Sequence, residues 1–195
     1  MHDERVNRCD YRIVSIHQPW VRPIVRGKQH KPTEFGAKIN VGMGADGIAT
    51  VDHFSWEAYN EGQDLPEQVE AYKVRFGHYP EVVLADRIYG TRDNRAYLKN
   101  KGMRFGGKPL DRPKKVTAEN ADQLKAQKKQ RHADYRQRIP IEGKFGQGKS
   151  GYRLNYNRAK RADTAQAWTN SIFFVMNLLV LYIQFFWPCF YQPGQ

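Results

Sequence analysis

The chain has 195 residues, of which 40% are hydrophobic and 13% aromatic, so it can bury a core of ordinary domain size and is not a disordered chain. Its 32 Lys and Arg residues exceed its 20 Asp and Glu residues, and the resulting net charge of +12 indicates nucleic acid or an anionic surface as a partner. Two cysteines at opposite ends, Cys9 and Cys189, exclude a disulfide-rich scaffold and a four-cysteine zinc site, and they favour a reducing cytoplasm.

The first half of the chain predicts short strands followed by a helix. We expect residues 1–35 to be irregular, because prolines interrupt their short apolar runs. A hairpin-like pair of strands is predicted over 35–43 and 48–54, around a turn that contains glycine. An amphipathic helix is expected over 65–77, with a proline in its first turn and a glycine at its end.

The second half predicts alternation of strands and helices, and then helices alone. Residues 82–85 form a short apolar run that stops abruptly at Asp86, which is typical of a buried central strand. Beyond it we predict a helix over 92–100, a short strand over 103–105, a polar helix over 117–135, a new helix from Pro140 and a last, apolar helix over 162–186. This order of elements indicates an α/β fold.

The apolar stretch 172–187 raises the question of a membrane. It has 16 residues and is interrupted by Asn177 and Gln184, whereas a membrane span needs about 20 apolar residues. We therefore expect a buried core helix and no membrane partner, with a membrane-anchored basic protein as the alternative. One face of this helix holds Ile172, Val175, Leu179 and Ile183, and it is widened nearly all round by Phe173, Met176, Val180 and Phe186, so we expect burial on all sides.

The positive charge is concentrated in one third of the chain. Residues 99–160 hold 18 Lys and Arg against 5 Asp and Glu, so this stretch alone carries the excess of the whole chain. Aromatic residues are interleaved with these basic residues. The pattern indicates a surface that binds nucleic-acid phosphates, although Lys125, Lys128 and Lys129 are expected to form a solvated face.

Two acidic residues are candidates for chemistry by their context. Asp86 follows a buried apolar strand, and in α/β sheets sites gather beyond the carboxyl ends of strands. Glu142 lies in an otherwise basic neighbourhood. Each has a plainer interpretation, since Asp86 can cap the next segment and Glu142 can form a local ion pair with a basic neighbour, Arg138, Lys144 or Lys149.

A pair of carboxylates is suited to phosphodiester chemistry. Such chemistry needs a metal to neutralise charge and to activate a hydroxyl, and two metals bridged by carboxylates serve both the attacking and the leaving oxygen. Mg²⁺ takes oxygen ligands and uses few protein carboxylates. Asp86 and Glu142 are therefore candidate ligands, beside basic residues that would hold a DNA backbone.

Residues 135–149 resemble the Y(2)R(3)E(6)K signature of bacterial insertion-sequence transposases. The residues that fit each gap in turn are Tyr135, Arg138, Glu142 and Lys149. Upstream, residues 84–95 resemble the block that holds the second catalytic Asp of that family. The resemblance covers about residues 12–180.

The resemblance implies an RNase H-like fold, a mixed sheet flanked by helices, and a DDE triad that binds two Mg²⁺ ions. Asp86 would be the second acid of the triad and Glu142 the third, and their side-chain oxygens should lie within about 8 Å of each other. Tyr135, Arg138 and Lys149 would contact the DNA of the transposon end. If the signature is helical, its spacing keeps these residues on one face.

The chain departs from the family pattern at its beginning. The first catalytic Asp of the family lies on a strand that would precede the matching part, where only eleven residues remain here. Asp3 and Asp10 do not lie in an apolar strand, and Asp46 and Asp52 fall in what should be later strands. We therefore expect the C-terminal part of a transposase, with the first strand missing.

The predicted organisation follows from this departure. Residues 1–35 form an irregular segment, 36–187 a partial RNase H-like DDE domain and 188–195 a tail. The implied function is DNA strand cleavage and transfer at transposon ends, inactive in this chain alone. A non-catalytic DNA-binding remnant that modulates a full-length transposase is the alternative. Expected partners are transposon-end and target DNA, a second copy or a full-length transposase, in a bacterial cytoplasm at the nucleoid.

Overall fold

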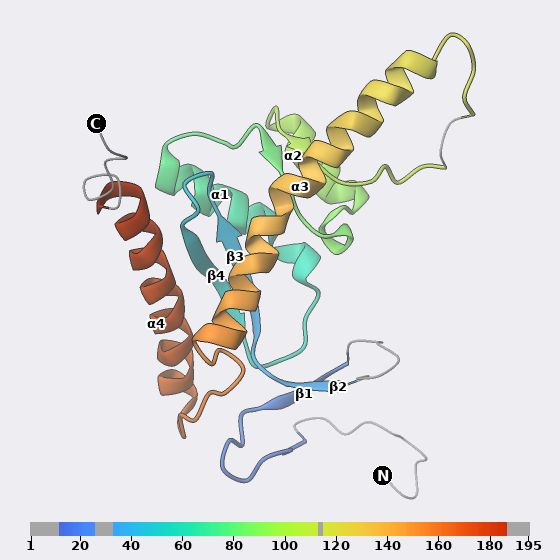
Figure 1. The fold of residues 1–195 in the computed structure, drawn as a ribbon. Helices are drawn as coiled ribbons and strands as arrows, with labels where there is room; N and C mark the ends of the chain where they lie inside the picture. Colours follow the sequence, from blue (N-terminus) through green and yellow to red (C-terminus); the bar gives the residue numbers. More distant parts are fainter. Residues whose placement is uncertain (1–11, 26–32, 113–114, 187–195) are drawn as a thin grey trace, which may run out of the picture. The chain divides into compact units, whose positions relative to one another are not determined.

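The computed structural model describes residues 12–25, 33–112 and 115–186 (Figure 1). They combine helices and short strands, in agreement with the predicted α/β class. The chain divides into two compact units, which we treat separately. The first unit comprises residues up to 41, 50–59 and from 150 onward, and the second unit comprises 42–49 and 60–149. The predicted tail and Trp187 lie outside the described residues.

The described strands pair as three two-stranded sheets, and not as the single mixed sheet that we expected. β1 (Arg22–Val25) pairs antiparallel with β2 (Thr33–Gly36), β3 (Lys38–Met43) pairs with β4 (Ala49–Ser55), and β5 (Val82–Val83) pairs parallel with β6 (Arg104–Phe105). The segment predicted to be irregular thus contains β1. Pro23 is tolerated there because both strands of a two-stranded sheet are edge strands, where a missing N–H can face solvent.

The β3–β4 pair confirms the hairpin-like pattern of the sequence. In its turn the Gly44 N–H donates to the Ile48 carbonyl at 3.2 Å, and Gly47 adopts a φ of +74°, which favours glycine. The Asp46 carboxylate accepts a hydrogen bond from the Ile48 N–H at 3.0 Å. In β4, Asp52 accepts one from the Thr50 hydroxyl. Both carboxylates thus have local partners.

The second unit is organised around a small apolar core. Helix α1 (Leu65–Phe76) ends at Gly77 with a φ of +80°, and α2 (Arg92–Asn100) has the predicted bounds and is capped by the Thr91 hydroxyl. The buried side chains of the core are Leu65, Val69, Leu98 and Met103. Each contributes about 1.5–3 kcal/mol through burial, so this cluster holds α1 and α2 together.

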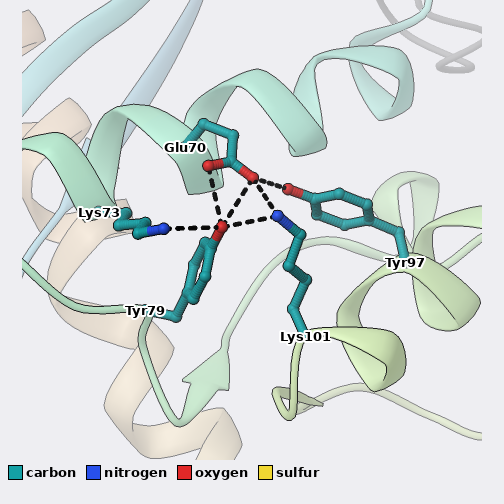
Figure 2. A network of polar contacts seen from close by, with 5 residues as sticks. All are labelled: Glu70, Lys73, Tyr79, Tyr97 and Lys101. Atoms are coloured by element: carbon teal, nitrogen blue, oxygen red, sulfur yellow. Dashed lines mark hydrogen bonds and ion pairs between the residues drawn. The ribbon is translucent and has the colours of Figure 1, made fainter.

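A polar network lies beside this core and connects α1, α2 and the segment before β5 (Figure 2). The Glu70 carboxylate accepts hydrogen bonds from the Tyr79 and Tyr97 hydroxyls, the latter at 2.6 Å, and from the Lys101 ammonium at 2.8 Å. The Lys101 ammonium also donates to the Tyr79 hydroxyl at 2.6 Å. Hydrogen bonds from Lys101 and Tyr97 lower the pKa of Glu70 to about 2.

The basic part of the chain forms one long helix, and this corrects the prediction of two. Helix α3 spans Ala121–Gly151 and contains Pro140, where a new helix was expected to begin (Figure 1). A proline within a helix removes one backbone hydrogen bond and crowds the preceding turn. Here the helix continues on both sides, although only residues 121–139 are rich in good helix formers such as Lys, Gln, Arg and Ala, whereas residues 141–151 include four glycines.

The apolar last helix is buried over only part of its surface, whereas burial nearly all round was predicted. Helix α4 (Ala162–Leu181) continues into a π-helical turn (Tyr182–Phe186). Its buried residues are Ala165, Thr169, Ile172, Phe173 and Met176. Of the residues expected to be buried, Ile172, Phe173 and Met176 are buried, whereas Val175, Leu179 and Ile183 are exposed. The burial follows the more N-terminal, less apolar part of the helix.

Residues 162–186 are also long and apolar enough to cross a membrane by length and composition. The mean hydropathy of their most apolar window is 1.6, and 22% of that window is buried. The core helix of a soluble protein meets the same criterion, so this feature favours neither interpretation by itself.

We predict that the Glu70→Gln substitution lowers the pKa of Tyr97 from about 12 toward its ordinary value of 10. Burial and the Glu70 carboxylate together raise that pKa, and the substitution removes the charge that disfavours a tyrosinate. The measurement is an alkaline titration of tyrosinate absorbance, with Tyr97→Phe to identify the group. Identical titration curves for the wild-type and Glu70→Gln proteins would contradict the network.

Candidate active site

The first candidate acid is placed by the parallel pair β5–β6. Asp86 follows Val83, the last residue of β5, by three positions and precedes a single 3₁₀ turn (Arg87–Tyr89). It occupies the N-cap position of that turn, yet its side chain makes no capping hydrogen bond and is 70% exposed. The plainer interpretation of Asp86 as a cap is therefore wrong, and its carboxylate is available to another group.

The turn after Asp86 is held by a close backbone contact. A Cβ atom at Gly62 would lie 2.6 Å from the Ile88 carbonyl oxygen, so only glycine fits this approach. Nearby, the Asn94 amide donates to the carbonyls of Gly62 at 2.6 Å and Tyr89 at 2.9 Å. These contacts fix both ends of the segment that follows the candidate acid.

The four residues of the predicted signature all lie on α3. Their spacings of three, four and seven residues bring them to one face of a helix. Because α3 is continuous through Pro140, the helical arrangement that the sequence left conditional is present. Tyr135, Glu142 and Lys149 are exposed on this face, whereas Arg138 is partly buried.

Arg138 brings the two candidate acids together. Its Nη1 donates to Asp86 Oδ1, and its Nη2 lies 2.8 Å from Glu142 Oε1 in an ion pair. A hydrogen bond and an ion pair on one guanidinium separate these two carboxylate oxygens by at most about 8 Å. Both candidate acids thus contact the same guanidinium, and the contact with Glu142 is also a local ion pair of the kind that the plainer interpretation expected.

A second ion pair attaches α3 to the strands. Asp134, which is 1% exposed, accepts hydrogen bonds from Arg104 of β6 at 2.6 and 2.9 Å. The Gln130 amide donates to the same carboxylate at 3.0 Å. The hydrogen bond from Arg104 lowers the pKa of Asp134, and that of Arg104 is raised.

Sequence reasoning missed this second pair. Asp134 directly precedes the first residue of the signature, and Arg104 lies 30 residues before it in a two-residue strand. Both belong to a polar, basic stretch in which hydrophobic periodicity carries no information about burial. The one available signal was the unusual presence of an acid among so many basic residues.

The residues proposed to contact DNA differ in their surroundings. The guanidinium of Arg138 lies 5.7 Å from the centre of the Tyr135 ring, so the two side chains can share one phosphate or base. Lys149 is exposed near the C-terminal end of α3. Lys144 on the same helix is buried, and burial lowers its pKa, which makes it a poor candidate for a solvent-facing DNA contact.

The carboxylates around Arg138 suit a hard cation that needs few ligands from the protein. Mg²⁺ is commonly held by one or two carboxylates, with water and phosphate oxygens completing its shell. Asp86 and Glu142 supply two such carboxylates. Within residues 12–25, 33–112 and 115–186, no three His, Cys, Asp or Glu side chains gather as a metal site.

Comparison with known families gives one match. Residues 83–179 match the family model described as the transposase DDE domain. The matched region starts in β5, contains Asp86 and all of α3, and ends within α4. No curated protein and no solved structure matches the chain significantly.

We predict that Asp134→Asn lowers the free energy of unfolding by about 1–3 kcal/mol at neutral pH, because it breaks a buried, hydrogen-bonded ion pair whose Arg is half exposed. The pKa of Asp134 is lower in the folded chain than its ordinary 3.8. The stabilisation is thus present above that ordinary value and is lost as pH falls through the lowered one. Urea unfolding of both proteins between neutral and acidic pH measures it. A difference that does not shrink with acidity would contradict this assignment.

Proposed function

Residues 83–179 belong to the transposase DDE domain family, and on that premise we propose that the chain carries the C-terminal part of an enzyme that cleaves and transfers DNA strands at transposon ends. The observation that carries the proposal is the meeting of Asp86 and Glu142 on Arg138. By the resemblance of the sequence to the family's motifs, we propose these residues as its second and third acids. A transposition-related function and DNA as the partner follow from the family itself.

We propose that the domain is RNase H-like and extends over residues 36–187. In support, β5 and β6 are parallel neighbours, the candidate acid follows the end of β5, and a long helix presents the other acid to it. This arrangement agrees with the rule that sites of α/β sheets lie beyond the carboxyl ends of strands.

Two carboxylates are proposed to hold the metal. DDE transposase domains generally use a divalent metal, and Asp86 and Glu142 have the oxygen donors that Mg²⁺ prefers. When bound, the cation would help to activate a water or a 3′ hydroxyl for attack on a phosphodiester. Two ions would require a further carboxylate, which we assign to the family's first Asp.

We propose two roles for Arg138. Without a cation, its guanidinium contacts both carboxylates, offsets one of their two negative charges and keeps them close to each other. If Asp86 and Glu142 held a cation, the same guanidinium would be released from them and would be able to bind a DNA phosphate with two hydrogen bonds. Tyr135 and Lys149 on the same helix face are proposed to contact the transposon end beside it.

The second candidate function is that of a DNA-binding chain without catalysis. It is favoured by the absence of a third acid from the Asp86–Glu142 pair within the described residues. Such a chain would modulate a full-length transposase by occupying its DNA or by associating with it. Both functions place the chain with DNA in the cytoplasm, at the nucleoid of a bacterium.

We predict that Arg138→Ala and Lys149→Ala each flatten the salt dependence of DNA binding. Each neutralised phosphate contributes about −0.9 to the slope of log affinity against log salt, so each variant should lose about that much. Fluorescence anisotropy with a labelled duplex over a range of salt measures it.

Lys129→Ala is the matched control for this experiment. It removes the same charge from the opposite side of α3, at 100° per residue, and should leave the slope close to the wild-type value. An affinity that does not change between low and high salt would refute phosphate binding.

We predict that the 195-residue chain binds DNA without nicking it in Mg²⁺, and that nicking appears when a segment carrying the missing strand is supplied. Two metals need a set of carboxylates that holds them about 3.5–4 Å apart. A nicking assay on DNA that bears the cognate ends measures activity, with Asp86→Asn and Glu142→Gln as controls. If the chain alone nicks DNA and both substitutions abolish the activity, another residue completes the site and the proposal of a missing acid fails.

A further inference from the structure

The contact between α3 and the β5–β6 pair lies outside the signature and has no place in the proposed chemistry. It is formed by Asp134 on the helix and Arg104 on β6, joined by two hydrogen bonds of 2.6 and 2.9 Å. The carboxylate is almost fully buried at 1% exposure. A planar guanidinium that grips both oxygens of a carboxylate fixes orientation as well as distance.

The absence of a side chain at Gly106 leaves room for the Asp134 carboxylate. A Cβ atom at Gly106 would lie 3.2 Å from Asp134 Oδ2 and 2.3 Å from a methyl carbon of Leu84. The Gly106 N–H in turn donates to the carbonyl of Val83, the last residue of β5, at 2.9 Å. The Arg104–Asp134 ion pair and the space beside Gly106 therefore specify both the position of α3 along its axis and its rotation.

The relative positions of the candidate acids depend on the same two elements, α3 and the β5–β6 pair. Arg138 and Glu142 follow Asp134 at intervals of four residues. The three residues therefore lie on one side of α3 and span a rise of about 12 Å along its axis. Asp86 follows Val83 by three residues. A slip of α3 by one residue would move Glu142 by about 1.5 Å and turn it by about 100°, away from Asp86.

We infer that Arg104 and Asp134 are positioning residues that set the register of α3, so that Arg138 and Glu142 face Asp86. Their relevance to catalysis rests on the proposed function, whereas the register itself does not. A buried ion pair is a weak source of stability, because apolar residues of similar volume often hold a contact as well or better. An apolar contact is not directional, however, so it does not select one register of the helix as the Arg104–Asp134 ion pair does.

This difference supplies the test. In a background with Cys9→Ser and Cys189→Ser, the substitutions Asp86→Cys and Glu142→Cys place two thiols at the candidate acids. A bifunctional thiol reagent about 8 Å long is used, because two carboxylates that contact one guanidinium lie at most about that far apart. The rate at which the reagent joins the two thiols reports their separation. This readout needs neither metal nor DNA.

Two variants are compared with one control. Asp134→Asn and the double variant Arg104→Met with Asp134→Leu should each slow cross-linking by about tenfold or more, since displacements near 1 Å have effects of this size on reactions between positioned groups. The double variant should remain folded and as stable as the wild type, by circular dichroism and urea unfolding. Glu70→Gln, which weakens the other polar network of the same unit, should leave the rate unchanged.

Mn²⁺ binding by isothermal titration calorimetry is the second measurement, made with the native acids in place. Loss of a residue that orients metal ligands costs about 10–100-fold in affinity, so both variants should bind Mn²⁺ at least about tenfold more weakly. Slower cross-linking in a chain whose wild type does not bind Mn²⁺ would support the positioning role and refute the proposed metal site. Unchanged cross-linking in the folded double variant would overturn the inference.

Discussion

The second unit depends on how one long helix is attached to two very short strands. Two residues each in β5 and β6 form too small a sheet to determine where a helix of 31 residues lies. The paired Arg104 and Asp134 make that contact specific, because a guanidinium and a carboxylate accept few relative orientations. Apolar burial supplies cohesion through Leu65, Val69, Leu98 and Met103, but it does so without direction.

Charge balance explains why the two candidate acids can lie close together. Two carboxylates within about 8 Å repel each other, and Arg138 places one positive charge between them. The arrangement leaves a formal excess of one negative charge, at side chains that are 70% and 54% exposed. Such a site can attract a divalent cation and is still tolerated by the folded chain in its absence. The surrounding basic stretch would oppose cation binding until DNA neutralises it.

The same protein uses a second polar cluster for a different purpose. Glu70 gathers two tyrosine hydroxyls and the Lys101 ammonium at the surface, and its lowered pKa reflects how fully its charge is compensated (Figure 2). Both of its carboxylate oxygens accept hydrogen bonds within this network. Asp86 differs because its side chain makes no capping hydrogen bond, is paired with Arg138 through one oxygen and lies mostly in solvent. The contrast indicates which acid is structural and which is available for chemistry.

The sequence by itself determined the features that depend on local order. The bounds of α1 and α2, the strand that ends before Asp86 and the spacing of the signature could all be predicted, since caps, breakers and periodicity act between near neighbours. The signature also carried the family assignment. The continuity of α3 through Pro140, the buried face of α4 and the separation of the strands into three pairs could not be predicted. Only the tertiary structure decided these features and joined Asp134 to Arg104 and Asp86 to Arg138, because such contacts join residues 30 and 52 positions apart and leave no periodic trace.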